Sequence, residues 1–147
     1  MKILALYGGA NHGKTNSIIQ TYNDLINFGA RIIWYQPRTN NLDFLAILDY
    51  QKKIITINSA GDSATEVING LNQIENELNR LNLKADCHIC ATRTKGGSIT
   101  ALNNHFAPIE PIWLDSLNLD SLKSTNNFQN VLNSYYNFQS LRIISHI

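Results

Sequence analysis

The sequence predicts an α/β domain: a three-layer α/β/α sandwich on a mostly parallel sheet of about five strands, with a possible antiparallel hairpin strand. Two observations carry this prediction. Short apolar runs of strand length alternate with stretches whose apolar residues recur at helical spacing. A glycine-rich turn separates the first such pair, as in a parallel strand–helix unit. The 147 residues suffice for a single domain, residues 1–147, with its own core.

The first elements are a strand, a helix and a second strand. Lys2–Tyr7 is an apolar run of strand length, and residues 16–26 follow the glycine-rich turn. The apolar residues of that second stretch have helical spacing: Ile18, Ile19, Tyr22, Leu25 and Ile26. Gly29 is suited to end this helix in a left-handed conformation. Residues 30–36 then predict a strand, which Pro37 stops.

Two apolar runs lie close together in the middle of the chain. Phe44–Tyr50 fits either a helical turn or a strand, whereas Lys53–Asn58 fits a strand. Only Gln51 and Lys52 separate them, and so short a connection favours a β-hairpin, although this pair is unusual in a tight turn. The hairpin would add one antiparallel strand to the sheet.

The second half of the chain continues the alternation. Ser63 and Glu66 form a capping box, which predicts the start of a long helix. The apolar stripe of this helix is Val67, Ile68, Leu71, Ile74, Leu78 and Leu81. Residues 85–91 predict a strand and residues 99–106 a short helix capped by Ser98. A last short strand at residues 112–114 and a closing helix at 128–147 complete the domain.

The glycine loop, residues 8–15, is the strongest functional signal. It reads Gly-Gly-Ala-Asn-His-Gly-Lys-Thr and matches the G-x-x-x-x-G-K-[ST] pattern between a strand and a helix. Gly8, Gly9 and Gly13 allow backbone N–H groups to turn inward toward a polyphosphate. The helix N-terminus that follows favours an anion. Lys14 is placed to neutralise phosphate charge and the Thr15 hydroxyl to ligate Mg²⁺.

On these residues the chain resembles the P-loop nucleoside triphosphatase superfamily, specifically over residues 2–26. The resemblance implies a site for ATP or GTP with Mg²⁺, and small kinases and small NTPases both remain open. One branch of the superfamily carries an additional lysine after the first glycine, but Gly9 stands there. The residues expected to bind the nucleotide are Gly8, Gly9, Ala10, Asn11, His12, Gly13, Lys14, Thr15 and Asn16.

Two further loops are expected beside the glycine loop, because ligands of α/β sheets bind at the carboxyl ends of strands. In residues 59–63, Asp62 is a candidate for holding Mg²⁺ with Thr15 or for positioning water; Asn58 and Ser59 are weaker candidates. The alternative is that Asp62 only favours the helix start. In residues 92–98, Arg93 is a candidate for a forked phosphate contact and Lys95 for a point charge. The alternative there is a polar turn.

Composition narrows the class of protein. The formal charge of +1 and the 16% charged residues argue against a strongly electrostatic nucleic-acid or membrane surface. No apolar run approaches the roughly 18 residues of a membrane span. The N-terminus lacks a signal-peptide pattern, so we expect a cytoplasmic protein. Cys87 and Cys90 lie three apart in a predicted strand, where their side chains face opposite sides, so both are expected to be buried core residues.

The expected function is Mg²⁺-dependent ATP or GTP binding with hydrolysis or phosphoryl transfer. Lys14 and Arg93 would stabilise charge in the transition state, and Asp62 would assist at the metal. A small-molecule phosphate acceptor, if there is one, is expected near residues 37–50. Two alternatives remain: a nucleotide-gated interaction module without turnover, and a flavodoxin-like FMN-binding reductase, which the opening of the chain also resembles.

Overall fold

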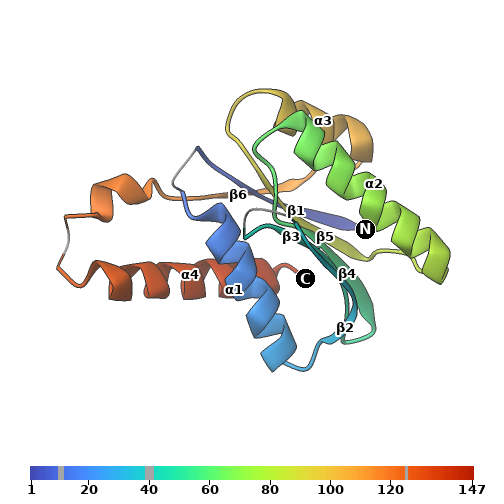
Figure 1. The fold of residues 1–147 in the computed structure, drawn as a ribbon, viewed down its shortest axis with the longest axis horizontal. Helices are drawn as coiled ribbons and strands as arrows, with labels where there is room; N and C mark the ends of the chain where they lie inside the picture. Colours follow the sequence, from blue (N-terminus) through green and yellow to red (C-terminus); the bar gives the residue numbers. More distant parts are fainter. Residues whose placement is uncertain (10–11, 39–41, 125) are drawn as a thin grey trace.

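Six strands and four α-helices make up the computed structural model, which describes residues 1–9, 12–38, 42–124 and 126–147 (Figure 1). The strands are β1 (Lys2–Tyr7), β2 (Arg31–Pro37), β3 (Phe44–Tyr50), β4 (Lys53–Asn58), β5 (Cys87–Thr92) and β6 (Ile112–Asp115). The helices are α1 (Lys14–Asn27), α2 (Ala64–Leu81), α3 (Gly97–Phe106) and α4 (Phe128–Ser145), with a 3₁₀ turn η1 at Leu119–Leu122.

All six strands form one mixed sheet in the order β2-β3-β4-β5-β1-β6. The pairs β4–β5, β5–β1 and β1–β6 are parallel, whereas β3 runs antiparallel to both β2 and β4. The α/β class and the mostly parallel sheet are therefore confirmed, and β3 is the antiparallel strand that the sequence indicated.

The β3–β4 hairpin turns on only two residues. Tyr50 pairs with Lys53, and both connecting residues have positive φ, 52° at Gln51 and 64° at Lys52. Positive φ at both central positions is the geometry that matches the twist of the paired strands. Phe44–Tyr50 is thus a strand, and the unusual turn residues accept the strained conformation that this hairpin requires.

Alternate residues of β1 face two separate apolar clusters. Leu4 and Leu6 pack with Ile18 of α1 and Ile143 of α4. Ile3 and Ala5 pack in the other cluster, with residues of α2 and α3 that include Leu71 and Leu102. Figure 1 shows the same division, with α1 and α4 together on one side of the strands and α2 and α3 on the other. Apolar side chains on both faces explain why the strands are almost continuously hydrophobic.

The helix ends follow the sequence with one exception. The capping box is confirmed, because Ser63 Oγ accepts from Glu66 N and the Glu66 side chain accepts from Ser63 N. Gly29 has φ 99° just after α1, as expected. Ser98, however, does not cap α3, which begins one residue earlier; its hydroxyl accepts a hydrogen bond from Arg93 N at 3.1 Å. None of the helices within the described residues is long and apolar enough to cross a membrane.

The two cysteines are confirmed as core residues on opposite faces of β5. Cys87 belongs to the cluster beneath α1 and α4, and Cys90 to the cluster beneath α2 and α3. Both thiols are free and buried. Burial raises the pKa of Cys87 to about 12 and raises that of Cys90 further. Both therefore remain protonated and unreactive at neutral pH.

Candidate functional site

Between β1 and α1, the described residues of the glycine loop are Gly8 and Gly9 after β1, and His12 and Gly13 before α1. Gly13 has φ 64°, a left-handed conformation that suits glycine, and its carbonyl accepts the first helical hydrogen bond, from Ser17 N at 2.9 Å. A cavity of about 270 Å³ opens at this helix N-terminus. Its lining residues are Gly9, His12, Gly13, Lys14, Thr15, Asn16 and Asp62. Ala10 and Asn11, expected to bind the nucleotide, lie outside the described residues.

Lys14 is buried within the loop, with 8% of its surface exposed. Its ammonium donates to the carbonyl oxygens of Gly8 at 2.6 Å and Gly9 at 3.0 Å. Burial lowers the pKa of Lys14, the nearby Asp62 carboxylate raises it, and the Arg93 guanidinium lowers it. The cation is therefore enclosed by backbone acceptors, and a phosphate oxygen could take the place of either carbonyl.

Thr15 reaches a carboxylate that the sequence did not single out. Its hydroxyl donates to Asp43 Oδ1 at 3.1 Å, and the hydroxyl of Ser59 donates to the same oxygen at 2.9 Å. Ser59 Oγ in turn accepts a hydrogen bond from Phe44 N at 2.9 Å. The first helical turn, the start of β3 and the end of β4 thus meet at one carboxylate. A hydroxyl beside an acid is a set of oxygen ligands that suits Mg²⁺.

The sequence does not point to Asp43, because the acid is expected in a loop that follows a strand and Asp43 precedes one. In a hairpin, the first strand begins at the edge where the second one ends, so the residue before β3 lies beside the end of β4. Leu45 pairs with Asn58, which aligns Asp43 with the loop after β4. The proposed hairpin was itself the signal that could have found this residue.

Asp62 and Arg93 form an exposed ion pair near the loop lysine. Arg93 Nε lies 3.3 Å from Asp62 Oδ1, and the two side chains are 45% and 60% exposed. Asp62 lines the cavity at the glycine loop, and both charges are close enough to affect the pKa of Lys14. The two predicted residues are thus brought together at the cavity. The acid hydrogen-bonded to Thr15 is nevertheless Asp43.

The remaining predicted site residues are less centrally placed. Lys95 is exposed and does not line the cavity within the described residues. His12 lines the cavity, but its Nδ1 lies 3.1 Å from both the carbonyl and the hydroxyl oxygen of Ser116, in the segment after β6. Asn16 also lines the cavity and donates to the hydroxyl of Tyr136 of α4 at 3.3 Å.

Buried polar side chains stand at the ends of the two strands that follow. Asn58 ends β4 and Thr92 ends β5, and both are almost completely buried. Neither Asn58 side-chain atom nor the Thr92 hydroxyl has a hydrogen-bond partner in the described chain. Buried polar groups without partners are rare in folded proteins, and they concentrate where a ligand or water completes the structure. Asn58 was a weaker candidate in the sequence, and Thr92 was only the first residue of a candidate loop.

Glycine is required where the loop after β4 crosses β5. A Cβ atom on Gly61 would lie 1.8 Å from the carbonyl oxygen of Ala91, so no other residue fits without a backbone shift. This close approach brings Asp62 to the end of β5 and explains its contact with Arg93. The loop after β4 and the loop after β5 meet because Gly61 lets the two backbones pass this closely.

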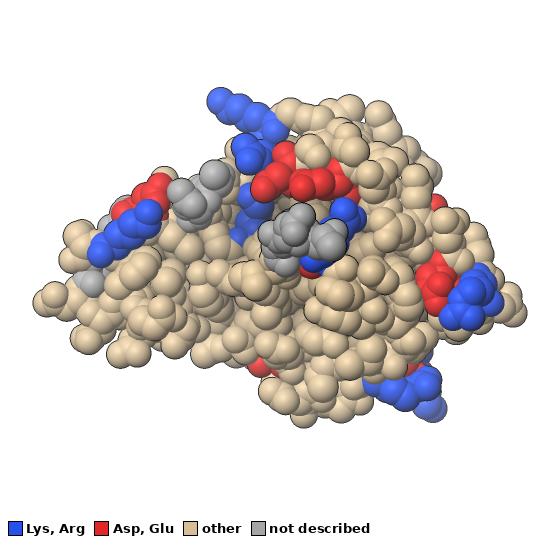
Figure 2. Space-filling view, viewed as in Figure 1, with Lys and Arg blue, Asp and Glu red and all other residues tan. Residues whose placement is uncertain are grey.

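Charged side chains gather at this edge of the molecule. Figure 2 shows Lys and Arg side chains beside Asp and Glu side chains near the starts of α1 and α2, whereas most of the remaining face is uncharged. Arg38 belongs to this group, and its guanidinium donates to the Glu66 carbonyl at 3.4 Å. A mixed group of charges around a cavity at a helix N-terminus is suited to a polyanion with a bound cation.

No three-residue cluster of His, Cys, Asp or Glu that could hold a metal occurs among the described residues. Mg²⁺ does not need one, because it is commonly bound by one or two carboxylates together with substrate phosphates. The site therefore offers a buried cation and a helix N-terminus at one cavity, and Thr15 of the cavity wall is hydrogen-bonded to the Asp43 carboxylate. Searches of protein-family models, curated proteins and solved structures found nothing similar to this chain.

Proposed function

We propose that this protein binds ATP or GTP with Mg²⁺ at the glycine loop and hydrolyses it or transfers its terminal phosphoryl group. The observation that carries the proposal is the placement of Lys14 and Thr15. Lys14 is enclosed by the loop carbonyls, while the next residue donates to Asp43. A glycine-rich turn with a surface lysine would leave the ammonium in water and the hydroxyl without an acid.

Each residue then has a role in binding. The loop N–H groups and the start of α1 hold the phosphates. Lys14 exchanges its carbonyl contacts for oxygens of the terminal phosphates, which concentrates positive charge where negative charge increases in the transition state. Positioning and charge neutralisation supply most of the catalysis in such reactions.

The oxygen ligands around Thr15 support the metal assignment. The Thr15 hydroxyl and the Asp43 carboxylate would hold Mg²⁺, which would neutralise phosphate charge when bound. Ser59 keeps the carboxylate aligned through its own hydrogen bond. We assign Asp62, the acid expected from the sequence, to the Arg93 pair instead, because 60% exposure and an ion pair make it a weaker metal ligand.

Arg93 is the candidate for a second phosphate contact. It is 45% exposed and tied to Asp62 by one hydrogen bond, so it can turn toward the cavity at small cost. A guanidinium that swings onto the terminal phosphate would act as an internal arginine finger. Of the segment expected to contact an acceptor, Phe44–Leu48 is buried, so these five residues would not contact one.

The proposed architecture is a three-layer α/β/α sandwich. The two apolar clusters on opposite faces of β1 support it, since each includes residues from a different helix pair. In such a fold, the carboxyl ends of β1, β4 and β5 share one edge, which is where the candidate loops lie.

Calorimetric titration of ATP and GTP, with and without Mg²⁺, tests the proposal. Lys14→Ala should weaken binding at least about tenfold, because a buried charged hydrogen bond to phosphate contributes roughly 1.5–3 kcal/mol. Arg80→Ala is the matched control, since it removes an exposed cation at the end of α2. Equal affinity of the Lys14 variant and the unmodified protein would overturn the assignment. Tight binding without phosphate release would favour the nucleotide-gated module.

A further inference from the structure

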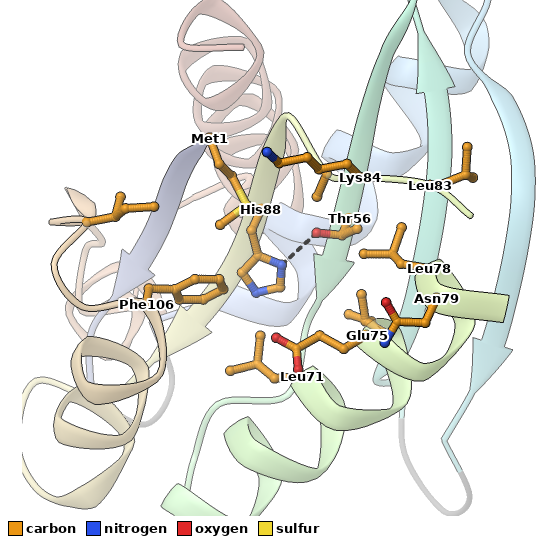
Figure 3. Close-up of a pocket in the computed structure, with 13 residues that line it drawn as sticks. Met1, Thr56, Leu71, Glu75, Leu78, Asn79, Leu83, Lys84, His88 and Phe106 are labelled. Carbon is orange, nitrogen blue, oxygen red and sulfur yellow. Dashed lines mark hydrogen bonds between the residues drawn. The ribbon is translucent and has the colours of Figure 1, made fainter. Parts of the chain in front are cut away.

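A second cavity lies beneath α2 and α3, away from the glycine loop. It has a volume of about 450 Å³ and shares no lining residue with the cavity at that loop. Figure 3 shows it between the second half of α2, the end of α3 and the strands β4 and β5. Its size falls in the range of roughly 300–1,000 Å³ that is typical of small-molecule sites.

Most residues that line this cavity are apolar, and Glu75, Asn79 and Lys84 also line it. Leu71, Ile74 and Leu78 line it from successive turns of α2, and Phe106 lines it from the end of α3. A ligand that covers these apolar walls removes their surface from water, which favours binding. An apolar ligand is the better occupant.

Two buried polar side chains, Thr56 and His88, stand among these walls. His88 of β5 is 1% exposed, and Figure 3 shows its ring between Thr56 and Phe106. Its Nδ1 lies 2.8 Å from the Thr56 hydroxyl, and its ring packs against Phe106 with centroids 5.3 Å apart. Its Nε2 is buried and has no hydrogen-bond partner among the described residues. A hydrogen bond to this atom would form away from water, where it is strongest.

The protonation state of the His88 ring indicates which chemical group could hydrogen-bond to Nε2. Burial, with a smaller effect of the nearby His105, lowers the pKa of His88 to about 3, so the ring is neutral at physiological pH. A neutral ring gives no reason to select an acid. Nε2 either accepts or donates, depending on which nitrogen carries the proton, and a hydroxyl can serve in both cases.

We propose that this cavity binds a small, mainly apolar alcohol or phenol whose hydroxyl group hydrogen-bonds to His88 Nε2. The apolar part of the ligand packs against the leucines of α2 and the ring of Phe106. The ligand is uncharged, and its binding does not depend on the function assigned to the glycine loop.

The test uses phenol and toluene, which have similar size and differ in the hydroxyl group. Each is titrated into the ¹⁵N-labelled 147-residue chain, and the histidine ring nitrogens are followed by long-range ¹H–¹⁵N NMR. Phenol should bind about two- to tenfold more tightly than toluene, as expected for one neutral hydrogen bond. Phenol should also shift the His88 Nε2 resonance, whereas toluene should not.

Two variants at one wall position locate the site. Ala85→Phe fills part of the cavity and should abolish phenol binding, whereas Ala85→Ser conserves the volume and should retain it. If the Phe variant does not fold, the comparison of phenol and toluene on the unmodified protein still decides. The proposal fails if phenol binds no more tightly than toluene, or if the His88 resonance does not respond. It also fails if Nε2 is already hydrogen-bonded in the free protein, because a buried water then supplies the partner.

Discussion

Replacing Asp43 by asparagine tests which of two acids, Asp43 or Asp62, holds Mg²⁺. The carboxylate accepts from Thr15 at 3.1 Å and from Ser59 at 2.9 Å through one oxygen. Charged hydrogen bonds contribute roughly 1.5–3 kcal/mol each and neutral ones roughly 0.5–1.5. Asp43→Asn should therefore cost about 1 kcal/mol per bond, or about 2 kcal/mol in the free energy of unfolding measured with urea.

The same variant should affect nucleotide binding only when Mg²⁺ is present. A loss of about 2 kcal/mol in the metal-dependent part corresponds to a roughly 30-fold weaker ATP affinity with Mg²⁺. In EDTA the affinity should stay the same or rise, since a negative charge near the phosphates is removed. Calorimetric titration under both conditions measures the difference.

Asp62→Asn is the matched comparison, because it makes the same change on an acid that is 60% exposed and bound to Arg93. We expect it to change the Mg²⁺-dependent affinity less than about threefold, as for an exposed ion pair. The opposite pattern, with a large effect from Asp62 and none from Asp43, would refute the assignment of the metal ligand and restore the acid that the sequence suggested.

Three further predictions concern the fold. Gly61→Ala should lower the free energy of unfolding by about 1–3 kcal/mol in urea titrations, because its Cβ would lie 1.8 Å from the Ala91 carbonyl oxygen. His88 has a pKa lowered to about 3, so the unfolded chain binds its proton first as the pH falls below about 6.5. Stability should thus decrease by up to about 2 kcal/mol from pH 6.5 to 5, and His88→Gln should abolish this part of the pH dependence. Cys87 and Cys90 should not react with a thiol reagent in the native protein at pH 7.5 and should both react in denaturant, because burial raises their pKa values.

Each of these has a result that would contradict it. An alanine at Gly61 with unchanged stability would mean that the loop moves away from β5 freely. An unchanged pH slope in His88→Gln would assign the titration to another group. Rapid labelling of either thiol in the native state would indicate local opening of β5.

Much of the fold followed from the order of apolar runs in the sequence. The glycine loop lies between a strand and a helix as expected, because its pattern is local and its flanking elements have clear periodicity. The sequence also predicts the hairpin, but it does not show that the hairpin brings Asp43 to Thr15. That contact is a matter of topology: the acid is 28 residues from Thr15 and reaches it only because β3 runs against its neighbours.

The part of the site that the sequence does not predict depends on which polar residues are buried. The type of a residue does not show whether it is buried. Asn58, Thr92 and His88 are ordinary polar residues in the sequence, and only packing under α2 and α3 leaves some of their atoms without partners. Ser98 is a further example, because its residue type does not determine its hydrogen-bond partner. Serine favours a helix cap, but here its hydroxyl binds the backbone of Arg93, and the helix starts at Gly97 instead.

The two-residue hairpin turn has a consequence far from its own position. β3 is seven residues long, so Gln51 and Lys52 lie roughly 25 Å from the Asp43 oxygen that accepts from Thr15 and Ser59. A turn of two residues fixes the register, that is, which residues of β3 and β4 pair with each other. One added residue there would slide β3 along β4, and each residue of the slide reverses which face a side chain occupies. The alignment of a carboxylate at one end of the sheet is thus set by the length of the connection at the other.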